Sequence, residues 1–323
     1  MSGMVMDNTT MKKRIAITLG DPGGVGAETV LRALPAISDV TRPLLIGDRP
    51  VIEAACSLLG VDLDLSLCDF IGTGAIAAAD FTRNIPSAEG GHAAVSYIRK
   101  AVELAQAGAV DAIVTAPISK EALKMAGYPW PGHTEMLAEL TGTSRYAMML
   151  CGGPIRVILV TIHTALKNVP SLITQDRVLA TVRLAKHACS MLGLTEPRMA
   201  VAGLNPHAGE SGIFGDEEQS AIIPALAAAE AEGIPVAGPF PPDTLFHKVY
   251  RGEFDIVVCM YHDQGLIPLK MIAFDSGVNV TVGLPIIRTS PDHGTAFDIA
   301  WKGIANPSSM IEAIKLAARL RKI

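Results

Sequence analysis

The chain has few of the features that mark membrane proteins or disordered chains. Only 18% of its 323 residues are charged and 5% are aromatic, whereas 49% are apolar, which is typical of a folded globular protein. No uninterrupted apolar run approaches the roughly 20 residues that a membrane-spanning helix needs. One of the longest candidates, Met148–Val160, is broken by Gly152-Gly153-Pro154 and Arg156. We therefore expect no membrane partner.

Cysteine and positive charge are also scarce. The five cysteines form no CxxC pair, which favours reduced thiols in a cytoplasm over a zinc finger or a disulfide framework. The net charge of −5 argues against a nucleic-acid partner. An anionic small substrate would need local positive charge, which Lys270 and Arg288 could supply. Residues 1–13 lack the apolar core of a secretion signal, and we interpret them as a disordered leader.

Short apolar runs alternate with helical patterns along the chain. Val278–Val282 is typical of a buried strand, and Gly91–Ala107 carries apolar residues at helical spacing. This alternation predicts an α/β fold with a mainly parallel sheet and helices on both faces. The other expected strands are Arg14–Leu19, Pro43–Ile46, Val61–Leu67, Ala112–Thr115, Tyr146–Leu150, Ile155–Val160, Met199–Ala202 and Ile256–Met260. The other expected helices are Ala27–Leu34, Pro50–Leu59, Glu135–Leu140, Thr174–Leu194, Asp216–Glu232 and Ser308–Leu320.

Three histidines each follow a predicted buried strand. His163 comes after Ile155–Val160, His207 after Met199–Ala202, and His262 after Ile256–Met260. The carboxyl ends of parallel strands share one edge of a sheet, so three imidazoles could converge there. Three neutral imidazoles suit Zn²⁺ or another divalent metal and leave positions open for substrate oxygens. A lone histidine is more often a hydrogen-bonded loop residue, but three in one topological position favour a metal site.

A second set of polar residues is suited to an anion. His133 and Thr134 stand at a predicted helix start, where side chains and backbone N–H groups can face an anion. Lys270, Asn279 and Arg288 add a point charge, an amide and a guanidinium fork. Asn279 lies within the apolar run Val278–Val282, where a buried amide needs a partner.

The glycine-rich segment Gly20–Gly26 follows a strand and opens a helix. Its spacing is neither GxGxxG nor a P-loop, so a dinucleotide site of the Rossmann type is disfavoured. Two interpretations stay open, a tight strand-to-helix turn and a phosphate-binding loop.

Six segments together resemble the 4-hydroxythreonine-4-phosphate dehydrogenase family of vitamin B6 synthesis, over the chain from about residue 14 to its end. These segments are Gly20–Gly26, Thr115–Pro117, Gly132–Glu135, Asn205–Glu210, Tyr261–Gly265 and Arg288–Thr295. Ser211–Glu218 and Thr295–Trp301 look closer to the branch that acts on D-threonate or D-erythronate 4-phosphate. Gly26-Ala27-Glu28 departs from the Gly-Pro-Glu that is usual in the family.

The resemblance implies an isocitrate/isopropylmalate dehydrogenase-like fold, with two α/β lobes separated by a cleft, and a homodimer with a shared active site. We expect one lobe at 14–127 plus 290–323 and the other at 128–289. The resemblance carries His163, His207 and His262 as ligands of one Zn, Mg or Co ion. It carries His133, Thr134, Lys270, Asn279 and Arg288 as substrate contacts.

The same resemblance implies a nicotinamide cofactor. The segment from His293 looks like the adenosine-binding segment of isopropylmalate dehydrogenases. Asp298 would accept hydrogen bonds from the ribose and repel a 2′-phosphate, which favours NAD over NADP. The expected cofactor contacts are His293, Gly294, Thr295, Asp298, Ile299 and Asn306.

The implied reaction is oxidation of a 4-phosphorylated 3-hydroxy acid followed by decarboxylation, with Lys270 and Asp243 as candidate proton acceptors. The substrate is 4-phosphohydroxy-L-threonine or, alternatively, D-threonate or D-erythronate 4-phosphate. A metal-dependent hydrolase and a phosphotransferase or acyltransferase on a related fold are the rival classes. Neither needs an adenosine segment.

Overall fold

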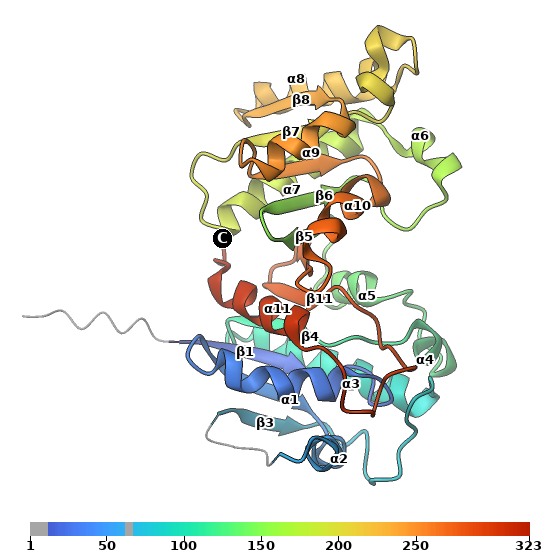
Figure 1. Ribbon diagram of the computed structural model, residues 1–323, viewed down its shortest axis with the longest axis vertical. Helices are drawn as coiled ribbons and strands as arrows, with labels where there is room; N and C mark the ends of the chain where they lie inside the picture. The colour runs from blue at the N-terminus through green and yellow to red at the C-terminus, as the bar shows by residue number, and fades with distance from the viewer. Residues whose placement is uncertain (1–11, 62–66) are drawn as a thin grey trace, which may run out of the picture.

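The protein is an elongated α/β molecule built on one continuous sheet (Figure 1). The structure is a computed structural model that describes residues 12–61 and 67–323. Its strands are β1 (Lys13–Thr18), β2 (Thr41–Gly47), β3 (Asp69–Gly72), β4 (Ala112–Thr115), β5 (Ala147–Gly152), β6 (Ile155–Leu159), β7 (Met199–Ala202), β8 (Val236–Phe240), β9 (Ile256–Cys259), β10 (Val278–Val282) and β11 (Arg288–Pro291). Its α-helices are α1 (Gly26–Ile37), α2 (Arg49–Leu59), α3 (Ala88–Gln106), α4 (Lys120–Met125), α5 (His133–Leu140), α6 (Val169–Leu172), α7 (Gln175–Met191), α8 (Ile223–Ala231), α9 (Pro242–Tyr250), α10 (His262–Ala273) and α11 (Ser308–Arg319).

Most of the expected elements are present within a few residues of their predicted bounds, but some differ. The helix expected over Asp216–Glu232 is interrupted, because a π-helical turn at Glu218–Ile222 precedes α8. Residues 62–66 of the strand expected over Val61–Leu67 and most of the expected leader lie outside the described residues, and neither Val61 nor Leu67 is in a strand; Lys13 already belongs to β1. No helix in the described ranges is long and apolar enough to cross a membrane.

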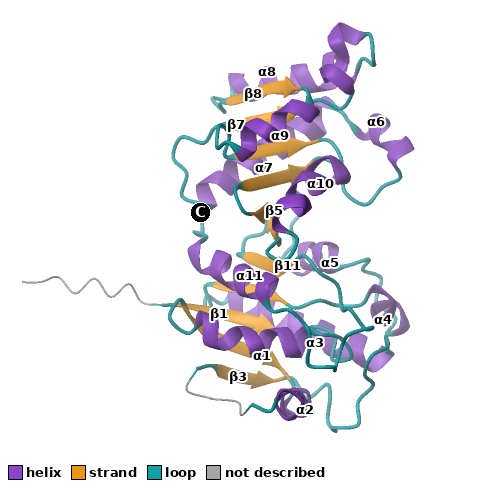
Figure 2. Ribbon diagram, viewed as in Figure 1, coloured by secondary structure: helices purple, strands orange, loops and turns teal. Residues whose placement is uncertain are grey.

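The sheet is mainly parallel, as predicted, but its centre is antiparallel. The strand order is β3-β2-β1-β4-β11-β10-β5-β6-β9-β7-β8. Seven of the ten strand pairs are parallel, and the three antiparallel pairs are β11 with β10, β10 with β5, and β5 with β6. Helices cover both faces (Figure 2).

The sheet has two parallel halves, β3-β2-β1-β4-β11 and β6-β9-β7-β8. Its twist brings the carboxyl ends of both halves to one side of the molecule. Hydrogen bonding gives β1 and β8 opposite directions, because an odd number of antiparallel pairs separates them. Each strand is rotated by about 20–25° relative to its neighbour, which adds up to roughly half a turn over this distance. The arrowheads of β1 and β8 accordingly point the same way in Figure 1. Loops from both halves can therefore reach one site.

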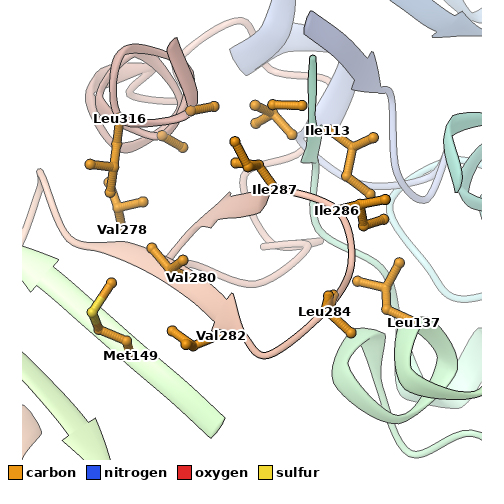
Figure 3. Close-up of a cluster of buried hydrophobic side chains, with 14 of the residues drawn as sticks. Ile113, Leu137, Met149, Val278, Val280, Val282, Leu284, Ile286, Ile287 and Leu316 are labelled. Atoms are coloured by element: carbon orange, nitrogen blue, oxygen red, sulfur yellow. The ribbon is translucent and has the colours of Figure 1, made fainter. Parts of the chain in front are cut away.

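The two halves share a hydrophobic core where they join. Val278, Val280 and Val282 of β10 belong to one cluster of buried side chains with Ile287, which directly precedes β11, and Leu316 of α11 (Figure 3). This core fixes the central strands, whose polar side chains enter the site described below.

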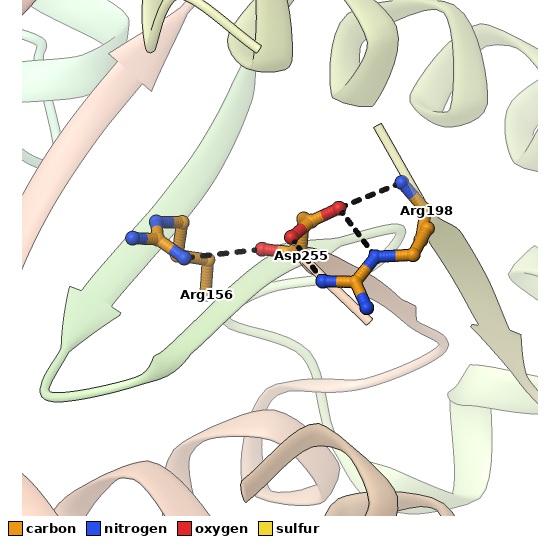
Figure 4. Close-up of polar contacts among 3 residues, drawn as sticks. All are labelled: Arg156, Arg198 and Asp255. Atoms are coloured by element: carbon orange, nitrogen blue, oxygen red, sulfur yellow. Dashed lines mark hydrogen bonds and ion pairs between the residues drawn. The ribbon is translucent and has the colours of Figure 1, made fainter. Parts of the chain in front are cut away.

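An ion pair between Arg198 and Asp255 aligns the amino-terminal ends of β7 and β9. Arg198, just before β7, donates from its backbone N–H and its guanidinium to the carboxylate of Asp255, which precedes β9, at 2.8–3.2 Å. Arg156 of β6 donates to the backbone oxygen of Asp255 at 3.4 Å (Figure 4). Hydrogen bonds from Arg198 hold the pKa of the Asp255 carboxyl below its usual value. Three neighbouring strands are thus aligned at the ends opposite the candidate histidines.

Candidate active site

A cleft of about 430 Å³ lies over the antiparallel centre of the sheet, between α5 and α10. Its walls come from both halves of the molecule. They include the predicted residues His133, Thr134, His163, His262, Asn279, Arg288 and His293, together with Lys120, Glu135, Ser290 and Asp292. A larger cavity of about 820 Å³ lies between α2 and β3 and is lined by none of the predicted site residues.

Arg288 is the most unusual residue of this cleft. Its side chain is buried, and its guanidinium donates to the hydroxyl of Thr115 at 2.7 and 3.1 Å and to that of Thr281 at 3.0 Å. No carboxylate among the described residues forms an ion pair with it. Burial lowers the pKa of Arg288 to about 9. Because a buried charge without a partner is costly, this cation points to an anionic ligand.

Three buried polar atoms without hydrogen-bond partners line the same cleft, within the part of the chain that the structure describes. They are Nε2 of His133, Oδ1 of Asn279 and Nε2 of His293. Burial, and then the charge of Arg288, hold the pKa of His133 well below its ordinary value, although a hydrogen bond to the backbone of Ala116 opposes this shift. Buried polar groups are rarely left unpaired, so these atoms indicate a polar ligand.

Two of the three predicted metal-binding histidines lie together. His163 follows β6 and His262 opens α10, and their ring centroids are 5.7 Å apart. Nδ1 of His262 is 2.7 Å from Oδ1 of Asp263. Burial, and then the charges of Lys120 and His262, lower the pKa of His163. Two imidazoles this close together are suited to a metal ion.

The third histidine does not join them within one chain. His207 is exposed on the segment after β7, which is drawn in yellow near the top of Figure 1, and its ring lies 6.0 Å from that of Phe214. Throughout residues 12–61 and 67–323, no group of three His, Cys, Asp or Glu side chains is placed to hold a metal ion. The convergence expected from strand order therefore holds for two histidines, because the loop after β7 turns away.

A second cavity, of about 300 Å³, adjoins the cleft at Asp292 and His293. The predicted cofactor residues His293, Ile299 and Asn306 line it, whereas Gly294, Thr295 and Asp298 do not. The Thr295 carbonyl accepts a hydrogen bond from the Val25 N–H, and Asp298 is exposed. Two adjoining cavities are what a reaction between two bound molecules requires.

The glycine-rich segment is a strand-to-helix turn. Its backbone N–H groups are largely taken by the protein itself: Asp21 donates to Pro117, Gly24 to Asp21, and Val25 to Thr295. At Gly20, which has φ +70°, a Cβ atom would lie 2.3 Å from the Pro117 carbonyl oxygen. Of the two interpretations left open by the sequence, the tight turn is supported and a phosphate-binding loop is not.

The sequence pattern did not indicate the contacts that hold the predicted cofactor segment. The buried carboxylate of Glu28 on α1 accepts from the backbone N–H of Trp301. Arg32 donates to the Ala305 carbonyl at 2.8 Å, and Asn84 donates to that of Ala300. These partners are far from the segment in sequence, so only the folded chain reveals them.

Lys270 and Asp243, the candidate proton acceptors, lie outside the cleft. Nζ of Lys270 pairs with Oδ2 of Asp292 at 3.2 Å, and Lys270 lines the second cavity. Asp243 is exposed in the first turn of α9 and lines neither cavity. Lys270 is thus beside the junction of the two cavities, whereas Asp243 is not.

Comparisons with known proteins agree with this geometry. Residues 39–317 match the family described as "Pyridoxal phosphate biosynthetic protein PdxA". The chain is 49% identical to a 4-hydroxythreonine-4-phosphate dehydrogenase of Desulforapulum autotrophicum, with 94% of each chain covered. It is 44% identical to a D-threonate 4-phosphate dehydrogenase of Pectobacterium atrosepticum, with 96% of this chain and all of that one covered.

Solved structures match over nearly the whole chain. A crystal structure of 4-hydroxythreonine-4-phosphate dehydrogenase from Klebsiella pneumoniae matches with a TM-score of 0.89 and 42% identity, covering 96% of this chain and 98% of that one. A phosphotransacetylase from Staphylococcus aureus, at 15% identity and a TM-score of 0.55, shares only the fold. The expected α/β fold is confirmed.

The fold, the paired cavities and these relatives define an oxidoreductase, a dehydrogenase that uses a nicotinamide cofactor. The chain belongs to the PdxA family of 4-hydroxythreonine-4-phosphate dehydrogenases.

Proposed function

We propose that this dehydrogenase oxidises and decarboxylates 4-phosphohydroxy-L-threonine to 3-amino-2-oxopropyl phosphate, with NAD as acceptor and with a divalent metal ion. The observation that carries the proposal is the buried guanidinium of Arg288, unpaired by any carboxylate that the structure describes, beside unpartnered atoms of His133 and Asn279. D-threonate or D-erythronate 4-phosphate, oxidised to dihydroxyacetone phosphate, is the second candidate, because a relative named D-threonate 4-phosphate dehydrogenase is 44% identical to this chain.

The anionic groups of the substrate would lie against Arg288. The two threonine hydroxyls fix the guanidinium plane, so its charge is oriented before the ligand arrives. His133, whose lowered pKa keeps it neutral, donates to the Ala116 backbone through its other ring nitrogen, so its unpartnered Nε2 can accept a hydrogen bond from the substrate without repelling Arg288. Thr134 and Asn279 would complete the contacts to the phosphate and carboxylate.

The chemistry runs in two steps. The carbon that bears the 3-hydroxyl gives a hydride to NAD⁺, and the hydroxyl gives its proton to a base. The resulting β-keto acid loses CO₂, and the enolate that remains takes up a proton. Lys270 is the better-placed of the two predicted bases, since it lines the cofactor cavity where that cavity meets the cleft.

The neighbouring imidazoles of His163 and His262 fit a divalent ion such as Zn, Mg or Co. When bound, the ion would supply Lewis acidity that favours loss of the hydroxyl proton and stabilises the enolate. One chain offers two of the three predicted ligands. We propose that His207 of a second copy completes the set.

A homodimer with a shared active site is supported by apolar side chains left exposed on two elements. On α10 and just after it, Met271 is 82% and Phe274 74% exposed. Beside His207, Ile213 is 73% exposed, and Phe214 also reaches the surface. Apolar patches of this kind mark protein interfaces. The α10 patch lies at the other end of the helix that His262 opens, and Phe274 also lines the second cavity, so a partner covering the patch would be near the site.

NAD is the proposed cofactor, with the segment from His293 to Asn306 around its adenosine. Exposed Asp298 supplies a negative charge that disfavours a 2′-phosphate. We place the enzyme in the cytoplasm, because its cysteines are scattered and form no CxxC pair.

The proposal is tested by following NADH absorbance with 4-phosphohydroxy-L-threonine and, separately, with D-threonate 4-phosphate, with and without a chelator. We expect turnover of the first substrate that the chelator abolishes. Faster turnover of the second would reassign the substrate, and no reduction of NAD with either, in metal-loaded protein, would defeat the dehydrogenase proposal.

The shared site is tested by co-expressing His163→Ala and His207→Ala chains. Each variant alone should be inactive, whereas mixed dimers should recover about a quarter of the wild-type sites, because each mixed dimer contains one intact site. Failure to recover any activity would place all three ligands on one chain.

A further inference from the structure

The segment after β7 contains a left-handed helical turn. His207, Ala208, Glu210 and Ser211 have φ of 53°, 53°, 40° and 59°, and Gly209 between them has φ +76°. For residues other than glycine this conformation costs roughly 1–2 kcal/mol each. Such strain persists only where the surrounding structure determines it, and it is concentrated at functional sites.

The buried carboxylate of Glu218 holds the turn in this conformation. Glu218 is 2% exposed and accepts hydrogen bonds from the backbone N–H groups of Leu204 and Asn205, each at 2.7 Å, and from the Asn205 side-chain amide at 2.9 Å. The turn also fits closely around it, because a Cβ atom on Gly209 would lie 2.7 Å from Oε2 of Glu218. One side chain therefore anchors the entry to the turn and contacts its middle.

Gln264 ties the same segment to the strand that leads to His262. Its side-chain oxygen accepts from the Met260 N–H at 2.7 Å, and its amide donates to the Gly203 carbonyl at 2.7 Å. The base of the turn is thus held in register with α10, although His207 itself is exposed.

We propose that Glu218 is a positioning residue for the metal site. It holds the left-handed turn, and the turn sets where the His207 imidazole stands. This inference rests on the proposed role of His207 as a metal ligand. It predicts that the carboxylate of Glu218 acts on the metal only through His207.

The test measures the dissociation constant of Zn²⁺ by calorimetric titration of the metal-free protein, for Glu218→Gln, His207→Ala and the double variant. Residues that orient metal ligands typically contribute about 10–100-fold to affinity. We expect Glu218→Gln to weaken Zn²⁺ binding by about that factor and to add less than about twofold in the His207→Ala background. Glu230→Gln, an exposed change on α8, is the matched control and should leave affinity unchanged.

Substitutions at Gly209 and Gly212 test the same proposal without changing Glu218, in case Glu218→Gln does not fold. Gly209→Ala pushes the turn against the Glu218 carboxylate, whereas Gly212→Ala, in the same segment and also at positive φ, meets nothing closer than 3.6 Å. Gly209→Ala should lower Zn²⁺ affinity about tenfold or more relative to Gly212→Ala.

The outcomes separate the two proposals. If His207→Ala weakens Zn²⁺ binding but neither Glu218→Gln nor Gly209→Ala does, the positioning role is wrong and the metal site stands. Equal losses for Glu218→Gln with and without His207 also overturn the positioning role. If His207→Ala leaves the affinity unchanged, His207 is no ligand and both proposals fail.

Discussion

At the scale of single residues, Asp21 in the glycine-rich turn has a carboxylate that is only partly satisfied. Oδ1 accepts from the Gly23 N–H at 2.9 Å, whereas Oδ2 is buried with no partner among the described residues. Burial raises the pKa of Asp21 to about 6, although the hydrogen bond from Gly23 opposes the shift. The carboxyl therefore holds its proton more tightly in the folded state than in the unfolded state. The protein loses stability as Asp21 ionises, and this loss is complete above about pH 6.

Asp21→Asn should accordingly stabilise the protein at pH 8 and have little effect near pH 4. The wild-type free energy of unfolding should rise as pH falls from above 6 towards 3.8, by up to about 3 kcal/mol, and the variant should lack this rise. Urea unfolding at several pH values measures it, with exposed Asp39→Asn as control. A variant less stable than wild type at pH 8 would contradict the prediction.

Arg288→Lys should raise KM for the phosphorylated substrate about 10–100-fold. The guanidinium contacts Thr115 and Thr281 at once, whereas an ammonium group can reach one of them and presents no planar fork to an anion. Hydrogen bonds to charged groups contribute about 1.5–3 kcal/mol, which corresponds to that range. Steady-state kinetics check it, and Arg319→Lys on the exposed end of α11 should be neutral. An unchanged KM would remove Arg288 from the substrate site.

The role of a single residue could be predicted from the sequence where a polar side chain stands among apolar neighbours. Asn279 was recognisable because an amide inside an apolar strand needs a partner, and its Oδ1 is indeed buried and unpartnered in the cleft. Thr115 and Glu28 stand in segments that carry the family resemblance, but their contacts with Arg288 and Trp301 were not predicted. A threonine at a strand end is ordinary, and the partner of Glu28 lies 273 residues away.

At the scale of elements, the packing of α10 on β5 depends on a glycine. A Cβ atom on Gly152 would lie 2.7 Å from that of Ala273 and 3.2 Å from Leu269, so the helix can approach the strand this closely only without a side chain there. Because α10 carries His262 and Lys270, its position sets the geometry of both cavities.

Gly152→Ala should therefore destabilise the protein by about 1–3 kcal/mol, as overpacking does, and also raise KM for substrate. Thermal unfolding and steady-state kinetics measure the two effects. Gly72→Ala at the end of β3 is the matched control, since its Cβ would meet only ordinary contacts at 3.7 Å. A loss of stability without any change in KM would mean that α10 does not transmit the displacement to the site.

Elements were predictable where buried apolar runs were continuous. The bounds predicted for β4, β7 and β10 match the structure. In contrast, β8 contains Gly238-Pro239, β11 is the polar run Arg288–Pro291, and α10 contains Gly265 and Pro268. Tertiary packing overrides the low propensity of these residues, and no local pattern reports that packing.

At the scale of the whole molecule, alternation of strands and helices predicted a parallel sheet but not its antiparallel centre. That centre joins the two halves and, with the twist, brings Arg288 and His262 into one cleft. Strand order alone predicted three converging histidines. It succeeded for His163 and His262, which follow the neighbouring strands β6 and β9, and it could not anticipate the left-handed turn that carries His207 outward.

The exposed apolar side of α10 is the part of the surface on which we expect a second copy to pack. Met271→Glu places a charge at the centre of the exposed apolar side of α10, and burying an unpaired charge at an interface costs about 2 kcal/mol or more. We expect wild-type protein to be a dimer by light scattering and the variant to be mainly monomeric at the same concentration. Leu166→Glu, at a residue 68% exposed elsewhere, should remain dimeric.

The monomeric variant should also bind Zn²⁺ about as weakly as His207→Ala, because each cleft would lack the imidazole that a second copy provides. Measuring both the dimer and the Zn²⁺ affinity therefore shows whether the exposed side of α10 is the interface and whether that interface completes the metal site. A variant that stays dimeric would show that α10 is not the interface. A monomer that keeps wild-type Zn²⁺ affinity would mean that His163 and His262 hold the ion without a partner, and would overturn the shared metal site.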